Sequence, residues 1–221
     1  MFFCLRVDLD YVPWDTPDAA EFGHGEPASF LRLLELARQT GFRFQFFGSN
    51  RVLRAFPSTA EAVLNDGHDL DWLCKHPSQA SVRFAEALEL FNHVDHSPTG
   101  LCVKSSWPGE VPTFLGIDSL QFLSARPGPA PTGLHLFPVE TRSVREATRA
   151  GLTARTWADA VKTQVRDAAS RNVDVTLTVR PQVLAKTDPR LSHLREILDM
   201  AQAVGLEVKS LRDAFRERKS G

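Results

Sequence analysis

Short apolar runs alternate with segments of helical periodicity along most of the sequence. The first run, Phe2–Leu9, predicts a buried strand, and Pro27–Thr40 predicts an amphipathic helix that Gly41 ends. The alternating segment Phe42–Gly48 predicts the next strand. Strand, helix and strand in this order make one βαβ unit. Because two parallel strands need such a crossover, the pattern favours a parallel α/β fold.

The rest of the chain repeats this order. We expect helices at Thr59–Asn65, Ser78–Phe91, within Ser143–Arg171 and at Ser192–Ala203, strands at His68–Cys74, Leu101–Val103, Ser119–Leu123, Leu134–Phe137, Val173–Val179 and Leu206–Leu211, and a short last helix. No internal repeat or linker divides the sequence, so we expect a single domain over residues 1–221. The number of strands favours closure into a barrel. An open doubly wound sheet is the alternative, but no Gly-rich phosphate loop follows the first strand, which disfavours nucleotide binding.

Composition excludes several classes of partner. A formal net charge of -1 gives no broad field to attract nucleic acid or an anionic membrane. The apolar start is interrupted by Arg6 and Asp8 and is too short for a signal peptide, and no apolar run is long enough to span a bilayer. The three cysteines lack the spacing of a metal knuckle. We therefore expect a cytoplasmic protein with reduced thiols and with neither a nucleic-acid nor a membrane partner.

Two carboxylates close the first strand. Asp8 and Asp10 are one residue apart, and side chains at i and i+2 of a strand point the same way. Both can address a site beyond the carboxyl end of the strand, where α/β folds gather their chemistry. A metal with a general base is the natural use of such a pair. Alternatively, the pair caps the strand and begins the turn toward Pro13.

The order of motifs resembles that of the polysaccharide deacetylases, the NodB-homology family of metal-dependent amide hydrolases. The segments that carry the resemblance are Val7–Asp10, Gly41–Phe47, Leu64–Asp71 followed by His76-Pro77, Gly133–Val139 and Thr176–Leu184. They span nearly the whole chain. The resemblance implies a distorted (β/α)7-8 barrel of the deacetylase type.

The resemblance also implies a site. Asp8 would be the base, and Asp10 and His76 would hold a divalent metal, with zinc as the first choice. Two departures are plain: Trp72 stands in place of the first metal-binding histidine, and Arg180 in place of the histidine of the last motif. Two protein ligands are too few for a catalytic zinc, which commonly has three.

Asp69 and Asp71 are further carboxylates that could replace a missing ligand. They lie early on their predicted strand, however, below its carboxyl end.

Three hypotheses for the function follow. The first is a divergent hydrolase of non-peptide carbon-nitrogen bonds that removes acyl groups from N-acetylated sugars or related small amides, with Trp72, Trp107 and Arg180 shaping the substrate pocket. The alternative is a catalytically inactive deacetylase-fold protein that binds a carbohydrate or anionic ligand, with Arg180 paired to Asp8 or Asp10. A phosphate-handling enzyme with magnesium on the two aspartates suits the carboxylates but leaves His76 unexplained. The tryptophans are equally suited to packing loops over the barrel.

Overall fold

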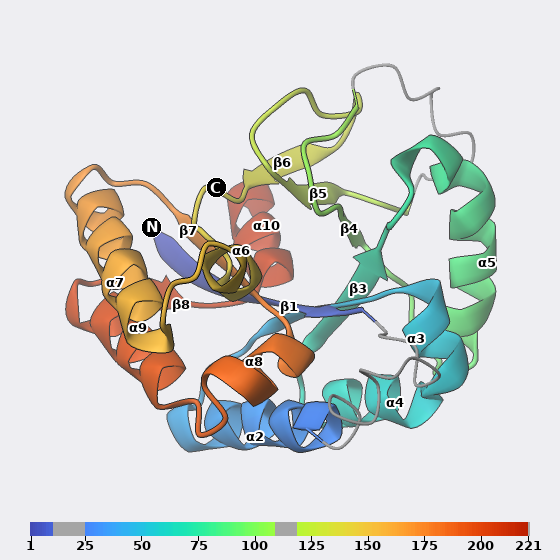
Figure 1. The fold of residues 1–221 in the computed structure, drawn as a ribbon. Helices are drawn as coiled ribbons and strands as arrows, with labels where there is room; N and C mark the ends of the chain where they lie inside the picture. The colour runs from blue at the N-terminus through green and yellow to red at the C-terminus, as the bar shows by residue number, and fades with distance from the viewer. Residues whose placement is uncertain (11–24, 109–118, 221) are drawn as a thin grey trace. The chain divides into compact units, whose positions relative to one another are not determined.

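The structure is a computed structural model that describes residues 1–10, 25–108 and 119–220 (Figure 1). It contains two compact units, each built from separate stretches of the chain. Unit 1 comprises residues 1–8, 12–44 and 141–210, and unit 2 comprises residues 9–11, 45–140 and 211–221. The single domain expected from the sequence stays a prediction.

Unit 1 is built around strand β1 (Phe2–Leu9), which belongs to it as far as Asp8. Strand β7 (Val175–Val179) pairs with β1 in parallel, from Phe3 opposite Val175 to Val7 opposite Val179. The short β8 (Glu207–Val208) pairs in parallel with the start of β1. All eight residues of β1 are buried, as expected of a parallel strand covered on both faces.

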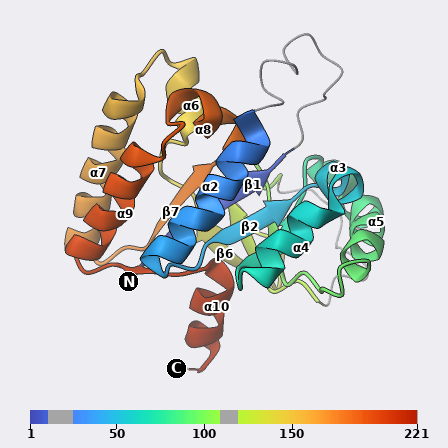
Figure 2. The same cartoon turned by 90° about the horizontal axis from the view of Figure 1, so that it is seen from below.

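The helices of unit 1 pack in pairs. They are α2 (Gly25–Thr40), α6 (Val144–Arg149), α7 (Ala154–Ser170), α8 (Pro181–Thr187) and α9 (Ser192–Ala203). Figure 2 shows α2 beside α8 and α7 beside α9. The buried residues of α7 include Trp157, Val161 and Val165, spaced by four, so one stripe of this helix faces the interior.

The described residues of unit 2 hold five parallel strands in the order of the chain. They are β2 (Gln45–Gly48), β3 (Asp69–Leu73), β4 (Gly100–Cys102), β5 (Phe122–Ala125) and β6 (His135–Pro138). The helices are α3 (Asn50–Ala55), α4 (Pro57–Asn65), α5 (Ala80–Asn92) and α10 (Leu211–Ser220), with a 3-10 turn, η1 (Pro77–Gln79), before α5. Gly100 lets β4 approach β5 closely, because a Cβ there would lie 2.1 Å from Cζ of Phe122.

The elements follow the predicted order, with local differences. The expected strand at Ser119–Leu123 is shifted to Phe122–Ala125, and the last expected strand is reduced to Glu207–Val208. The expected helical stretch Ser143–Arg171 is broken into α6 and α7 at Gly151, which has a φ of +74°. Sequence reasoning missed α3 and α8. Pro181 at the start of α8 is a helix-start signal, since proline is favoured there.

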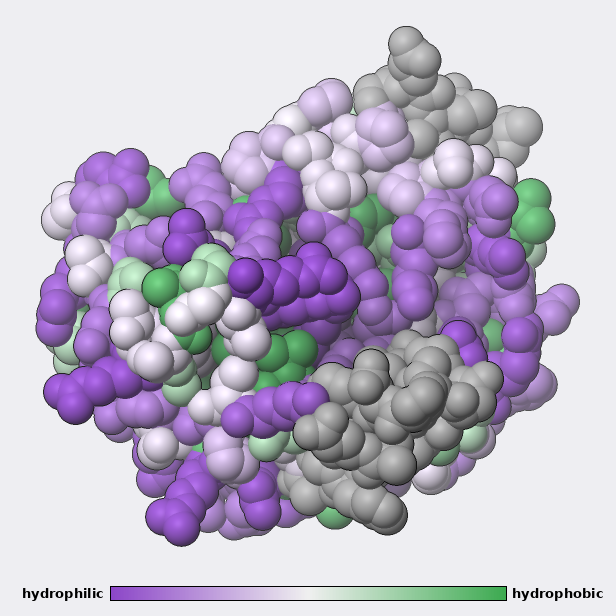
Figure 3. All heavy atoms as spheres, viewed as in Figure 1, coloured by the Kyte–Doolittle hydropathy of each residue, from purple (hydrophilic) through white to green (hydrophobic). Residues whose placement is uncertain are grey.

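The face shown in Figure 3 is mainly hydrophilic, with hydrophobic residues in small separate patches. Exposed large apolar side chains of the described ranges are Met1, Leu31, Val82 and Val173. No helix among the described residues has the length and apolar character needed to cross a membrane.

Candidate functional site

The predicted base, Asp8, is paired with a buried arginine of its own strand. Arg6 lies two residues earlier on the same face of β1, so its guanidinium reaches the carboxylate. Nε of Arg6 is 2.7 Å from Oδ1 of Asp8, and Nη2 is 3.2 Å from Oδ2. Both side chains are 1% exposed. This is a bidentate, charge-assisted pair inside unit 1.

Arg180 adds a second guanidinium to Asp8. It follows β7 directly, and the pairing of Val7 with Val179 brings it beside the end of β1. Nη2 of Arg180 is 3.9 Å from Oδ2 of Asp8, and its side chain is 10% exposed. The expected ion pair between Arg180 and one of the two aspartates is therefore present, on Asp8. Sequence reasoning missed Arg6, whose signal was a charged residue within an apolar strand, at i−2 from Asp8.

The predicted metal ligand, Asp10, lies in unit 2 with two lysines. Nζ of Lys75 is 2.8 Å from Oδ1 of Asp10, and Nζ of Lys104 contacts Oδ2. Lys75 and Lys104 each come two residues after the end of a strand, β3 and β4 respectively. The ends of these strands are aligned, because the Cys74 amide donates to the Cys102 carbonyl at 2.9 Å. Each carboxylate oxygen of Asp10 therefore faces an ammonium group.

The charge state of Asp10 follows from two opposing effects. Burial alone would raise the pKa of its carboxyl group. Hydrogen bonds and charges of Lys104 and Lys75 outweigh burial and lower the pKa below the usual value of 3.8. Asp10 is thus ionised at neutral pH and neutralised by lysine.

These residues do not fit a catalytic metal. Within residues 1–10, 25–108 and 119–220, no three His, Cys, Asp or Glu side chains group so that they could hold a metal ion. The other predicted ligand, His76, has an exposed side chain and precedes η1, where its carbonyl accepts from the Gln79 amide at 2.9 Å. A metal on Asp10 would have to displace two ammonium groups, and such a cation would stand beside their positive charges.

Neither of the tryptophans proposed for the substrate pocket has a ring face open to a ligand. Trp72 is 1% exposed in β3, where its indole nitrogen donates to Oδ1 of Asn50 at 2.7 Å. Its ring centroid lies 5.1 Å from that of Phe84 on α5. Trp107 is 3% exposed. Both indoles are buried, which agrees with the packing role considered for them from the sequence.

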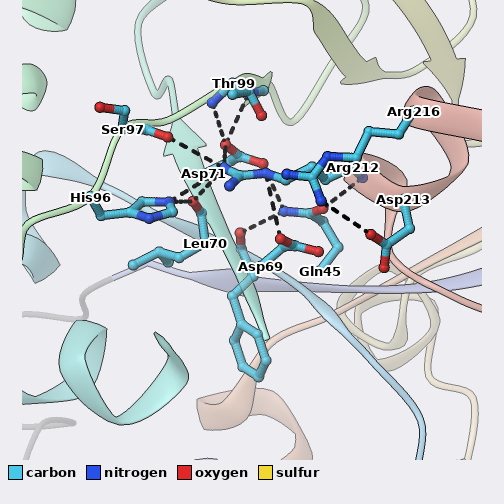
Figure 4. Close-up of polar contacts among 12 residues, drawn as sticks. Gln45, Asp69, Leu70, Asp71, His96, Ser97, Thr99, Arg212, Asp213 and Arg216 are labelled. Atoms are coloured by element: carbon cyan, nitrogen blue, oxygen red, sulfur yellow. Dashed lines mark hydrogen bonds and ion pairs between the residues drawn. The ribbon is translucent and has the colours of Figure 1, made fainter. Parts of the chain in front are cut away.

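Asp71, considered as a replacement ligand, is engaged by four donors (Figure 4). Its Oδ1 accepts from the amides of Thr99 at 2.7 Å and Gly100 at 2.9 Å, and from Nη2 of Arg212 at 2.7 Å. Its Oδ2 accepts from Nε2 of Gln45 at 3.0 Å. Burial raises the pKa of Asp71, and the arginine and the two amides oppose that rise. The carboxylate therefore ties α10 to β3 and to the start of β4.

Asp69 and His96 border the same network (Figure 4). Oδ1 of Asp69 lies 3.5 Å from Nε of Arg212. Nε2 of His96 lies 2.7 Å from the Leu70 carbonyl, so this nitrogen carries the proton and donates. Burial lowers the pKa of His96, and the charge of Arg212 lowers it further, so the ring is neutral at pH 7. Asp69 and Asp71 thus serve a structural network and are not spare metal ligands.

Comparison with known proteins places the fold. No protein-family model matches the sequence, and no curated protein matches it either. Among solved structures, a protein from Mycobacterium smegmatis classed as a polysaccharide deacetylase has a TM-score of 0.80 and 14% identity, covering 99% of this chain and 90% of its own. The Puue allantoinase has a TM-score of 0.77 and 12% identity, covering 97% and 88%. A CE4 family pseudoenzyme from Bacillus anthracis has a TM-score of 0.65 and 10% identity, covering 97% and 65%.

These matches confirm the predicted fold class and the family resemblance at the level of structure. The chain has the α/β fold of the polysaccharide deacetylases, a fold shared by proteins classed as enzymes and by a pseudoenzyme.

Proposed function

We propose that this deacetylase-fold protein binds a carbohydrate ligand and does not catalyse metal-dependent hydrolysis of it. The observation that carries this proposal is the pairing of Asp10 with Lys75 and Lys104. The carboxylate that would hold the metal already has its charge neutralised by side chains of the chain itself.

The other residues that a metal-dependent hydrolase of this type would need are also replaced or already paired. Asp8, the candidate base, accepts hydrogen bonds from Arg6 on both carboxylate oxygens. Trp72 and Arg180 stand where the resemblance implies histidines. A guanidinium cannot act as a general acid or base near neutral pH, because it stays protonated. A general acid for the leaving amine is therefore not supplied from Arg180.

One structural neighbour supports the same reading. The Bacillus anthracis protein is described as a CE4 family pseudoenzyme, and a mutant of it has restored enzymatic activity. In that protein the fold persists without catalysis. Fold similarity alone leaves the activity of the present chain open, so the proposal depends on its own ion pairs.

A metal-dependent hydrolase of carbon-nitrogen bonds in N-acetylated sugars is the second candidate. The retained order of Asp8, Asp10 and the exposed His76 favours it. It requires that a divalent metal displace the two lysines from Asp10.

The two candidates differ in metal content and in acetate release. The purified protein is equilibrated with zinc, freed of unbound metal and analysed by mass spectrometry for metal per chain. Acetate release from N-acetylglucosamine oligosaccharides is measured for the wild type and for Asp10→Ala, and binding of the same sugars is followed by calorimetry. We expect sugar binding with neither bound zinc nor acetate release. One zinc per chain, with acetate release that Asp10→Ala abolishes, would establish the hydrolase instead.

A further inference from the structure

We propose that Lys75 and Lys104 form a binding site for an oxyanion, a carboxylate or phosphate carried by the carbohydrate ligand. This inference rests on the proposed binding function and names the chemical group that the site recognises.

The geometry of the cluster separates a buried acid from two more exposed bases. The side chain of Asp10 is 8% exposed, whereas those of Lys75 and Lys104 are 33% and 30% exposed. Both lysines follow neighbouring parallel strands of unit 2, and the carboxyl ends of such strands are where α/β folds bind ligands. The chain just before Asp10 is held beside the end of β2, the neighbour of β3, since the Leu9 carbonyl accepts from the Ser49 amide at 3.2 Å.

Asp10 holds the two lysines together. Two ammonium groups and one carboxylate sum to a charge of +1 for these three residues, and repulsion between the ammonium groups is offset by the carboxylate between them. An ammonium group has three N–H donors. The contact of Lys75 with Asp10 uses one donor, and the exposed part of the side chain leaves others facing solvent. Two ammonium groups that Asp10 already holds in place lose little entropy when a ligand binds.

The chemistry of these donors selects the ligand. Lysine binds carboxylates and phosphates as a point charge, without the planar geometry that arginine imposes. A cationic ligand would be repelled, and a neutral hydroxyl group would gain little from two ammonium groups. The two oxyanions are distinguished only by experiment.

Calorimetry in a low-chloride buffer tests the proposal with three probes: glucuronate, glucose 6-phosphate and glucose. The variants are Lys75→Gln and Lys104→Gln. Lys162→Gln serves as the matched control, because Lys162 lies on α7 of unit 1 and also pairs with two carboxylates, those of Asp159 and Glu196. We expect at least one anionic probe to bind more tightly than glucose, and to bind more weakly as salt is added.

Each glutamine at Lys75 or Lys104 should weaken that anionic probe about tenfold, the loss of one charge-assisted hydrogen bond. Lys162→Gln should leave its affinity unchanged. Thermal unfolding of each variant shows that it is folded.

Three results would overturn the oxyanion site. In the first, neither glucuronate nor glucose 6-phosphate binds. In the second, glucose binds as tightly as the anionic probes. In the third, both lysine variants bind the anionic probe as tightly as the wild type does. In the last two cases carbohydrate binding without hydrolysis would still stand. Stoichiometric zinc with acetate release would instead remove the proposed function itself.

Discussion

Loss of Arg212 should destabilise unit 2 severely, because Asp71 would become a buried carboxylate without its cation. Asp71 is 0% exposed and Arg212 is 8% exposed. Removing one partner of a buried ion pair costs about 3–5 kcal/mol. In Arg212→Met, Asp71 keeps three donors, the amides of Thr99 and Gly100 and the side chain of Gln45. We therefore expect the lower end of that range, about 3 kcal/mol.

The loss in free energy of unfolding is measured by urea unfolding of Arg212→Met, Asp71→Asn and the double variant. Hydrogen exchange of the α10 amides serves as a local readout. The double variant should be less destabilised than the sum of the single variants, by about 0.5–3 kcal/mol, since the two groups interact directly. Arg216→Met is the control on the same helix. Arg216 is exposed and lies 3.6 Å from Asp213, so its loss should cost about 1 kcal/mol or less. The reasoning would be refuted if Arg212→Met destabilised the protein no more than Arg216→Met does. It would also be refuted if the destabilisation of the double variant equalled the sum of the two single variants.

Three further variants test local features of unit 2. Because the pKa of His96 is lowered from 6.5 in the folded protein, the unfolded chain takes up a proton first, and the free energy of unfolding falls as the pH drops below 6.5. His96→Gln should therefore make the free energy of unfolding depend less on pH between about pH 8 and 5. An unchanged pH dependence would contradict this. Gly100→Ala should lower the free energy of unfolding by about 1–3 kcal/mol, because the added methyl group would collide with Phe122. Adding Phe122→Leu to this variant should recover part of the loss, as measured by urea unfolding. If nothing is recovered, the collision is not the cause. Trp72→Phe removes the hydrogen bond to Asn50 and should lower the unfolding free energy by about 1 kcal/mol, so an unchanged urea midpoint would show that the bond contributes nothing.

The order of strands and helices was predictable because each depends on local periodicity. Phe2–Leu9 and Ser192–Ala203 have the same bounds in the structure as in the prediction. The very short elements were not predictable in this way, since periodicity needs several residues to show. The last predicted strand, Leu206–Leu211, therefore appears as only Glu207–Val208, followed by a helix that begins at Leu211.

The site was predictable only in part. The rule that places Asp8 and Asp10 on one side of the strand also places Arg6 there, so the Arg6 pair was within reach of the sequence. The pairing of Asp10 with Lys104 depends on which strands become neighbours, and the two residues are 94 positions apart. Asp71 and Arg212 are 141 positions apart, and no local pattern links them. Substitution of Trp72 for histidine was readable, but its burial against Phe84 required the packed structure.

The most direct measurement is the pKa of the Asp10 side chain, followed by carbon-detected NMR titration of its carboxyl group. The titration is done on the wild type and on the double variant Lys75→Gln/Lys104→Gln, each with and without zinc. If lysines neutralise this carboxylate in place of a metal, its pKa in the wild type lies below 3.8 and zinc leaves its resonance unchanged. Loss of both lysines leaves burial as the main influence, so the pKa should rise. A wild-type pKa above 3.8, together with a resonance that shifts on addition of one equivalent of zinc, would contradict the account.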